Sequence, residues 1–211
     1  MDARIDAATP RHVWTPADFL DLGGRDAVDK ALQRRAAQGR LRRIDRGLYD
    51  RPHLNSLTGQ PNAPDPTSVI DAVARRDQLR LLVDGMTAAN DLGFTNAVPA
   101  KIVVHTEGRL KPIRLGKMEI LFRTTTPSKL LWAGRPAMRL VQALHWLRDL
   151  EDRGDHDPGI IRRLKALLQD PARGAALRAD LADGFSSLPI WMQERVRPLI
   201  KAELAQIATA A

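Results

Sequence analysis

Arginine side chains crowd one short stretch of this sequence. Between positions 34 and 51 the chain carries seven basic residues against two acidic ones, Asp45 and Asp50, which is a net charge of +5. The basic residues are Arg34, Arg35, Arg40, Arg42, Arg43, Arg46 and Arg51. A guanidinium bonds phosphate oxygens, or the edge of a guanine base, through two parallel N–H groups. The chemistry that this stretch favours is therefore nucleic-acid binding.

Two predicted helices lead into the basic stretch. Thr15 is a good N-cap, Pro16 suits the first helical position, and Gly23 suits the end of that first helix. A second helix is predicted from residue 25 to residue 38, because apolar residues recur there at helical spacing. These apolar positions are Val28, Ala31 and Leu32.

A hairpin is predicted directly after the second helix. Residues 40–44 and 48–50 resemble two short strands around the loop Asp45-Arg46-Gly47, and a glycine-containing loop of three residues fits a hairpin. Helix, turn, helix and basic hairpin in this order are typical of a winged helix-turn-helix, whose second helix enters a DNA groove. We therefore predict a DNA-binding domain over residues 1–52.

The arginines of this domain are expected to have different roles. Lys30, Gln33 and Arg34 lie on the exposed face of the second helix and are candidates for base contacts. The candidates for backbone contacts are Arg40, Arg42, Arg43 and Arg46. Arg35 falls near the apolar face, so we expect it to lie along the edge of the core. Tyr49 is expected to pack into the core. A basic helical hairpin that binds nothing is the alternative.

The rest of the chain predicts a second, larger α+β domain. Residues 53–66, rich in proline, are expected to form a linker or an irregular loop, followed by the domain over residues 67–211. Strands are predicted at 79–83, 101–106 and 117–123, with 113–115 pairing between the last two. Helices are predicted at 67–76, 86–92, 137–150, 158–168 and 190–207, with Pro198 splitting or kinking the last one. Short strands followed by helices indicate an α+β fold with a small sheet and C-terminal helices.

A second candidate basic surface lies in this domain. Its residues are Lys101, Arg109, Lys111, Arg114 and Lys117, and Arg123 follows them; the acids in the stretch are Glu107 and Glu119. Such a sheet face fits DNA, RNA or an acidic partner protein, and it fits a solvated surface equally well.

Composition limits the remaining classes of function. The formal charge is +8, from 33 basic and 25 acidic residues, and a basic balance favours acidic partners. The chain has no cysteine, which excludes disulfides and cysteine-based zinc sites. We predict a cytoplasmic protein without a membrane span or a cofactor, and we favour a monomer because no heptad seam is evident.

No catalytic motif stands out. The five histidines show no metal-ligand spacing, and no phosphate-binding glycine loop occurs, so we expect no enzyme and no metal site. A remote alternative is a metal-dependent nuclease that uses Asp84, Glu107 and Glu119 with a lysine such as Lys111 or Lys117. The acidic run Asp155 to Asp157 is better interpreted as a turn and helix cap than as a metal loop.

Two runs together resemble a known family. They are AVDKALQRRAAQGRLRRIDRGLYDRP and GMTAANDLGFTNAVPAKIVVHTEG. Over roughly residues 11–150 the chain is similar to the AbiEi-like antitoxins of bacterial type IV toxin–antitoxin systems. The helix-and-wing motif falls on Lys30, Arg34, Arg40, Arg42, Arg43 and Arg46. The second signature falls on Gly85, Ala88, Ala89, Asn90, Leu92, Gly93, Val98, Pro99, Ala100 and Lys101.

This resemblance implies a function in two parts. The N-terminal domain would bind double-stranded DNA at the promoter of its own operon and repress it, and the C-terminal domain would counteract a cognate nucleotidyltransferase-like toxin. The family usually has leucine where this chain has Arg35, so we expect the local core packing to differ. The stretch before Trp14 is short, so we expect either a truncated first helix or a misassigned start codon. The alternative is a stand-alone transcriptional regulator with a ligand-sensing or oligomerising C-terminal domain. The second signature also has a structural interpretation, in which Gly85 and Gly93 bracket a helix and Asn90 braces a turn.

Overall fold

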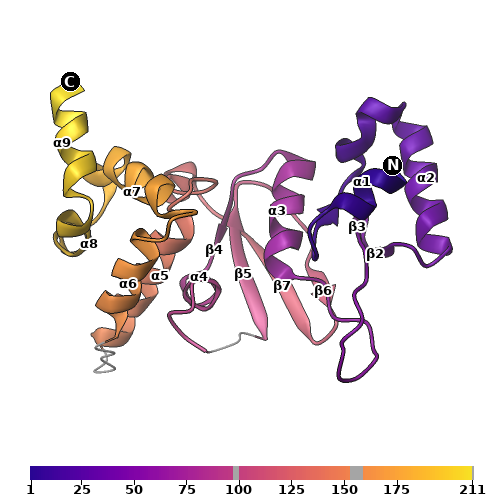
Figure 1. The fold of residues 1–211 in the computed structure, drawn as a ribbon, viewed down its shortest axis with the longest axis horizontal. Helices are drawn as coiled ribbons and strands as arrows, with labels where there is room; N and C mark the ends of the chain where they lie inside the picture. The colour runs from indigo at the N-terminus through magenta and orange to yellow at the C-terminus, as the bar shows by residue number, and fades with distance from the viewer. Residues whose placement is uncertain (97–99, 153–158, 211) are drawn as a thin grey trace. The chain divides into compact units, whose positions relative to one another are not determined.

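The structure, a computed structural model, describes residues 1–96, 100–152 and 159–210. It divides into two compact units, each of which combines segments from different parts of the chain (Figure 1). Unit 1 holds Met1–Leu81 and Thr106–Thr125, and unit 2 holds Leu82–His105 and Thr126–Ala211. The domain boundaries expected at residues 52 and 66 remain predictions. The α+β class is confirmed, with small sheets and a C-terminal set of helices.

The N-terminal part of unit 1 contains three helical segments. These are α1 (Asp2–Ala7), the 3₁₀ helix η1 (Pro16–Leu22) and α2 (Arg25–Ala37). Thr15 precedes η1 as expected, and its backbone N–H donates to the carboxylate of Asp18 over 2.6 Å. The predicted first helix is therefore present in the tighter 3₁₀ form, while α1 adds a segment that the sequence interpretation did not identify.

A three-stranded sheet completes this part. It comprises β1 (Val13–Trp14), β2 (Arg42–Asp45) and β3 (Leu48–Asp50), in the order β1-β3-β2, with antiparallel pairs throughout. The predicted hairpin is thus confirmed. The register shifts between Arg43 and Asp45, as in a β-bulge, and Gly47 takes the left-handed conformation (φ 66°) that closes the turn.

One apolar cluster joins the helices to the sheet. Its buried members are Ile5, Trp14, Phe19, Val28, Leu32, Leu41 and Tyr49. Trp14 and Phe19 pack with ring centroids 5.0 Å apart. Every one of the three helical segments and two of the three strands contribute, so this core holds α2 beside the hairpin. The expectation that Tyr49 belongs to the core is confirmed, since only 3% of it is exposed.

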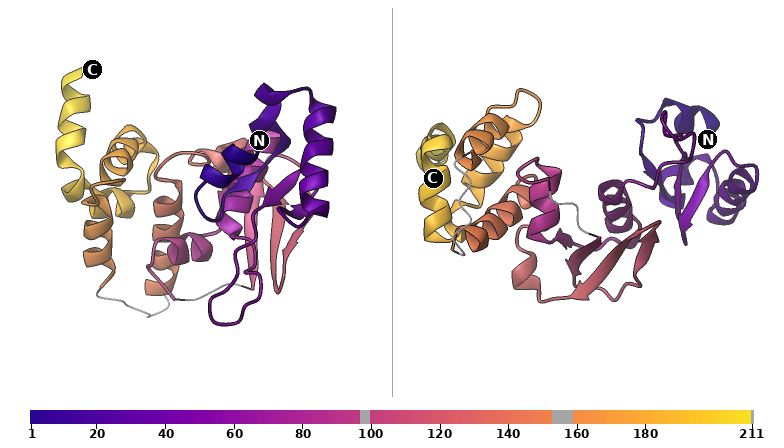
Figure 2. Two further views of the ribbon diagram at one scale, coloured as in Figure 1. Left: turned by 45° about the vertical axis from the view of Figure 1, so that its right-hand side comes forward. Right: turned by 90° about the horizontal axis from the view of Figure 1, so that it is seen from below.

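A long loop then leads to α3 (Pro66–Asp77), as Figure 2 shows. Asn55 orders its tip, because the Asn55 side-chain oxygen accepts hydrogen bonds from the N–H groups of Leu57 and Thr58. Asp65 caps α3 through the N–H of Ser68 over 2.9 Å. The prediction of an irregular loop before a helix is confirmed.

The second sheet has four strands, β4 (Leu81–Val83), β5 (Lys101–Thr106), β6 (Ile113–Leu115) and β7 (Met118–Thr124). Their order is β4-β5-β7-β6. The expected placement of residues 113–115 between the other two strands is wrong. A two-residue turn with Gly116 (φ 67°) folds β6 back on β7, with Ile113 opposite Ile120, and this places β6 at the edge.

Helices make up most of unit 2. Helix α4 (Gly85–Asp91) packs on α5 (Met138–Glu151), and a Cβ at Gly85 would lie 2.6 Å from the carbonyl oxygen of Gln142. Ala88 and Ala89 are fully buried, so small residues allow the close approach of α4. The remaining segments are η2 (Pro127–Leu130), α6 (Ile160–Leu168), α7 (Gly174–Asp183), η3 (Phe185–Ser187), α8 (Ile190–Val196), η4 (Arg197–Leu199) and α9 (Lys201–Ala210).

Pro198 does split the last predicted helix, into α8 and α9. Helix α7 was not predicted. The turn expected at Asp155 to Asp157 and the predicted start of a helix at Pro158 lie outside the described residues, as do Val98 and Pro99. In the part of the chain that is described, no helix has the length and apolar character needed to span a membrane.

Candidate nucleic-acid interface

The exposed face of α2 carries the three predicted base-contact residues. Lys30, Gln33 and Arg34 are exposed, on the side of the helix opposite the buried Val28 and Leu32. Ala27 and Ala37 lie among them and line the same shallow surface. Small residues between long polar ones allow the backbone of a helix to come close to the bases in a groove of a nucleic-acid duplex. The structure therefore places these three side chains together, as the sequence predicted.

Arg35 does not share that face. Its guanidinium donates two hydrogen bonds to the carboxylate of Asp2, over 2.8 and 2.6 Å, and a third to the carbonyl of Ala31. The two bonds to Asp2 raise the pKa of Arg35, and they lower the pKa of Asp2 below its ordinary 3.8. Arg35 thus ties α2 to α1. Arg40 also contacts Asp2, over 2.9 Å.

The guanidinium of Arg42 has partners within the protein. It stands opposite Asp50 in the hairpin register and donates to both carboxylate oxygens, over 2.9 and 2.5 Å. A further bond reaches the carbonyl of Asn62 over 2.6 Å. Asp50 is 4% exposed, so this pair closes the base of the hairpin and holds the loop that follows β3. The geometry favours a structural role for Arg42 over the backbone contact that the sequence suggested.

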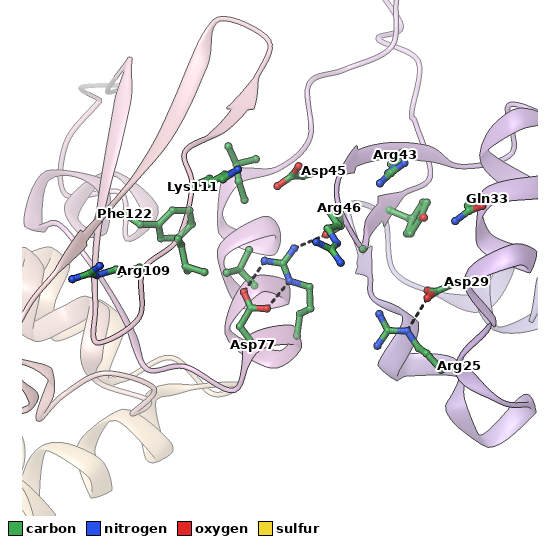
Figure 3. Close-up of a pocket in the computed structure, with 16 residues that line it drawn as sticks. Arg25, Asp29, Gln33, Arg43, Asp45, Arg46, Asp77, Arg109, Lys111 and Phe122 are labelled. Carbon is green, nitrogen blue, oxygen red and sulfur yellow. Dashed lines mark hydrogen bonds and ion pairs between the residues drawn. The ribbon is translucent and has the colours of Figure 1, made fainter. Parts of the chain in front are cut away.

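Arg43 and Arg46 have the opposite character. Both are exposed, and among the described residues neither guanidinium has an ion-pair or hydrogen-bond partner. Arg43 projects from β2 and Arg46 from the turn of the hairpin, as Figure 3 shows. Their charge is available to a ligand from outside.

These two arginines line an open groove of about 700 Å³ that lies entirely within unit 1. Its walls come from α2, the β2–β3 hairpin, the end of α3 and the segment before β6 (Figure 3). The charged and polar lining residues are Arg25, Asp29, Gln33, Arg43, Asp45, Arg46, Arg76, Asp77, Arg109 and Lys111. Tyr49, Val73, Ile113 and Phe122 form apolar parts of its surface.

The groove has an excess of positive charge after its internal pairs are set aside. Arg25 pairs with Asp29 over 2.9 Å, and Arg76 pairs with Asp77 over 2.6 Å. Arg43, Arg46, Arg109 and Lys111 then remain against Asp45. A surface of this kind attracts an extended anion, because it gathers several cations that have no acidic partner within the described part of the chain.

Two residues of the second candidate surface therefore join the first. Arg109 and Lys111 share the groove with the hairpin arginines, although about 60 positions separate them in the sequence. The other members do not line it. Arg114 lies 3.7 Å from Glu119, Lys117 is exposed in the β6–β7 turn, and Lys101 begins β5 in unit 2.

Arg25 and Arg76 are groove residues that the sequence interpretation missed. Arg25 begins α2, and Arg76 ends α3, in a helix that was assigned to the other domain. Helical periodicity places Arg76 on a polar face but does not show what that face meets. Its contribution depends on a tertiary contact, for which the sequence contains no local signal.

The residues of the nuclease alternative each have another partner. The carboxylate of Asp84 caps α4 by accepting from the N–H and hydroxyl of Thr87, over 3.1 and 2.7 Å, and it also accepts from the N–H of Val103. Glu107 pairs with Arg80, which lowers the pKa of Glu107. Glu119 lies near Arg114. Among the described residues, no group of three or more potential ligands could hold a metal ion.

The second signature has local structural roles. Gly85 allows the contact between α4 and α5, and Gly93 ends the helical region with φ 70°. The Asn90 amide donates to the carbonyl of Thr95 over 3.3 Å, which braces the turn. These residues thus build and close one short helix, as the structural interpretation expected.

Comparisons with known proteins identify a family. No curated protein matches the chain. A family model described as a family of unknown function, DUF6088, matches residues 2–171, which include all of the groove and both signatures. The chain therefore belongs to the family of unknown function DUF6088.

Proposed function

We propose that this protein binds double-stranded DNA through α2 and the β2–β3 hairpin. The observation that carries the proposal is the convergence of exposed cations on these two elements. Lys30 and Arg34 project from α2, and Arg43 and Arg46 from the hairpin, with no acidic partner for any of them among the described residues. Arginine and lysine in such positions neutralise phosphates, and the side chains of an exposed helix face can reach base edges.

The element order supports a winged-helix interpretation of residues 1–52. A helix, a short strand, two helical segments and a hairpin follow one another, and the first strand pairs with the last. In a winged helix this arrangement presents the helix before the hairpin to the major groove. On that basis α2 would read bases through Lys30, Gln33 and Arg34, while Arg43 and Arg46 would contact the backbone.

The groove extends the proposed contact surface. Arg109 and Lys111 line it together with the hairpin arginines. A duplex seated on α2 and the hairpin would bring further phosphates to these two side chains. They would add affinity without adding sequence preference, because phosphate contacts carry no base information.

The biological role that we propose is that of an antitoxin and autorepressor. This part rests on the resemblance to AbiEi-like antitoxins described above. The DNA would be the promoter of the protein's own operon, and a cognate nucleotidyltransferase-like toxin would be counteracted through the C-terminal part. A stand-alone regulator would share the DNA-binding surface and differ in having no such toxin gene beside it.

Fluorescence anisotropy with full-length protein tests DNA binding. The probes are a duplex from the gene's own upstream region and a scrambled duplex of equal length. We expect a clear preference for the upstream duplex, and a loss of about tenfold or more for Arg34→Ala or Arg43→Ala. Arg162→Ala, at an exposed arginine of α6, is the matched control and should bind as wild type. Equal affinity of the wild type for both duplexes would contradict sequence-specific repression.

Co-expression tests the antitoxin role separately. The neighbouring nucleotidyltransferase-like gene is induced with and without the full-length protein, and growth is recorded. Rescue by wild type and also by the Arg34→Ala/Arg43→Ala variant supports neutralisation that does not need repression. Absence of such a neighbouring gene, or absence of any rescue, favours the stand-alone regulator.

A further inference from the structure

The last turn of α3 holds the N-terminal sheet at two places. Arg75 donates from Nη2 to the carbonyl of Val13 in β1 over 3.0 Å. Arg76 donates from Nη1 to the carbonyl of Arg46, in the turn between β2 and β3, over 2.6 Å. Two consecutive arginines of one helix therefore reach the edge strand β1 and the tip of the hairpin. Both acceptors are main-chain oxygens, so the bonds fix backbone and not merely side chains.

The guanidinium of Arg76 is itself held in place. Its Nε and Nη2 donate to the two carboxylate oxygens of Asp77, over 2.8 and 2.6 Å. The side chains of Arg76 and Asp77 are only 22% and 26% exposed. Figure 3 shows these bonds as the dashed lines that end on Asp77 and on Arg46. The planar guanidinium of arginine suits this role. Its Nε and Nη2 edge can bind a carboxylate while Nη1 donates to another acceptor.

The stem of Arg76 also lies close to the turn. A Cβ at Gly47 would lie 3.5 Å from Cδ of Arg76, which is ordinary van der Waals contact. Gly47 is the left-handed residue that sets the direction of the turn. The hydrogen bond to Arg46 therefore holds the turn at its first residue, and the stem of Arg76 lies beside the second.

We propose that Arg76 is a positioning residue that preorganises the hairpin for DNA, and this inference rests on the proposed function. A short hairpin exposes most of its backbone hydrogen bonds and opens readily unless other elements hold it. If the hairpin had to become ordered during binding, the lost conformational entropy would weaken the affinity. A clamp from α3 orders the hairpin before DNA arrives. Three of the five N–H groups of Arg76 already donate inside the protein, and its charge is paired with Asp77, so we expect its effect on DNA to be indirect.

The test combines hydrogen exchange with DNA binding in full-length variants. In Arg76→Gln, free of DNA, we expect amides of residues 42–50 to exchange about tenfold faster, with α5 unchanged as the internal control. DNA affinity should fall about three- to tenfold, while the slope of log affinity against log salt stays at the wild-type value. Asp77→Asn should produce the same pattern in weaker form, because it leaves Arg76 without its orienting carboxylate.

Arg43→Gln is the contrasting variant. It should leave hairpin exchange unchanged and flatten the salt slope by about 0.9, as expected for one lost phosphate contact. Unchanged hairpin exchange in Arg76→Gln would overturn the clamp. A flattened slope in Arg76→Gln would overturn the indirect role, because Arg76 would then contact a phosphate itself. If the wild type binds no duplex although Arg76→Gln loosens the hairpin, the proposed function fails while the clamp stands as a property of the fold.

Discussion

Arg35 donates two hydrogen bonds to the carboxylate of Asp2, which lies 33 positions away in the sequence. The pair ties the first residue of α1 to the last turn of α2, the helix whose other face carries Lys30 and Arg34. Ile5 in the same short helix is buried in the core of the N-terminal part. The N-terminal residues are therefore part of the support for the proposed recognition helix.

Asp2→Asn should lower the melting temperature at neutral pH and lose that effect in acid. Hydrogen bonding to Arg35 holds the folded pKa of Asp2 below the ordinary 3.8. The stabilisation is therefore complete above the unfolded pKa and disappears as the pH falls through the lower, folded value. Thermal melts of wild type and variant between pH 7 and pH 2 measure this. A difference in melting temperature that stays constant into acid would contradict the ion pair. Asp2→Asn should have a smaller effect in the Arg35→Gln background than in the wild type, because the contact with Arg40 is then what it removes.

Arg42→Ala and Arg43→Ala should separate stability from binding. Arg42→Ala leaves Asp50 buried without its cation and should cost about 3 kcal/mol of unfolding free energy. Arg43→Ala, at an exposed neighbour, should change stability by less than about 0.5 kcal/mol and weaken DNA binding. Urea unfolding and anisotropy on the same preparations give both quantities. Equal stability of the two variants would show that the Arg42–Asp50 pair does not hold the hairpin.

Arg109→Gln/Lys111→Gln should weaken binding to all duplexes alike. Each side chain is expected to neutralise one phosphate, so the slope of log affinity against log salt should flatten by about 1.8. The ratio of affinities for the upstream and scrambled duplexes should stay constant. The measurement is a salt titration by anisotropy, with Arg114→Gln/Lys117→Gln as a control outside the groove. An equal effect in the control would indicate that general charge, and not the groove, determines affinity.

Gly85→Ala should destabilise unit 2 by about 2 kcal/mol or more. The new methyl group would lie 2.6 Å from the Gln142 carbonyl oxygen and from Cβ of Trp146, so α4 has to move away from α5. Gly93→Ala is a useful comparison, because it meets open space and should cost only about 1 kcal/mol for the left-handed backbone. Denaturant unfolding followed by tryptophan fluorescence reports both. A smaller loss at position 85 than at 93 would contradict the close helix contact.

Asp84→Ala should remove a helix cap and cost about 2 kcal/mol, since three hydrogen bonds end on this carboxylate. We expect no change in DNA cleavage between wild type and variant in Mg²⁺ or Mn²⁺, and no effect of EDTA on stability. Plasmid-nicking assays beside urea unfolding check both points. Metal-dependent cleavage by the wild type that disappears in a folded Asp84→Ala would revive the nuclease alternative.

The elements that the sequence predicted well are those with a strong local pattern. Helix α2 is defined by its own apolar spacing, and the hairpin by Gly47 between two short runs, so both were located to within two or three residues. Thr15 and Pro16 likewise marked the start of η1. In each case neighbouring residues contain the information that decides the structure.

The features that were missed depend on distant partners. Helix α1 is six residues long, and its stability comes from Ile5 in the core and Asp2 on Arg35, which no local pattern reveals. The edge position of β6 is an exception, because it follows from the local turn at Gly116, which the sequence interpretation did not use. For the candidate site, Arg43 and Arg46 were identified by charge alone, but charge could not distinguish them from Arg42, whose carboxylate partner stands eight residues away.

The two compact units differ in their charge. Unit 1 has 19 basic and 13 acidic residues, so it carries +6 of the total of +8. The electrostatic field of this uneven charge would act on a polyanion before any contact forms. It would orient the diffusing protein so that unit 1 approaches the polyanion first. At low ionic strength, a larger fraction of encounters between protein and polyanion would then lead to binding than for randomly oriented molecules. The advantage should fade once the Debye length, about 8 Å at physiological salt, becomes shorter than the separation at which the molecule is oriented.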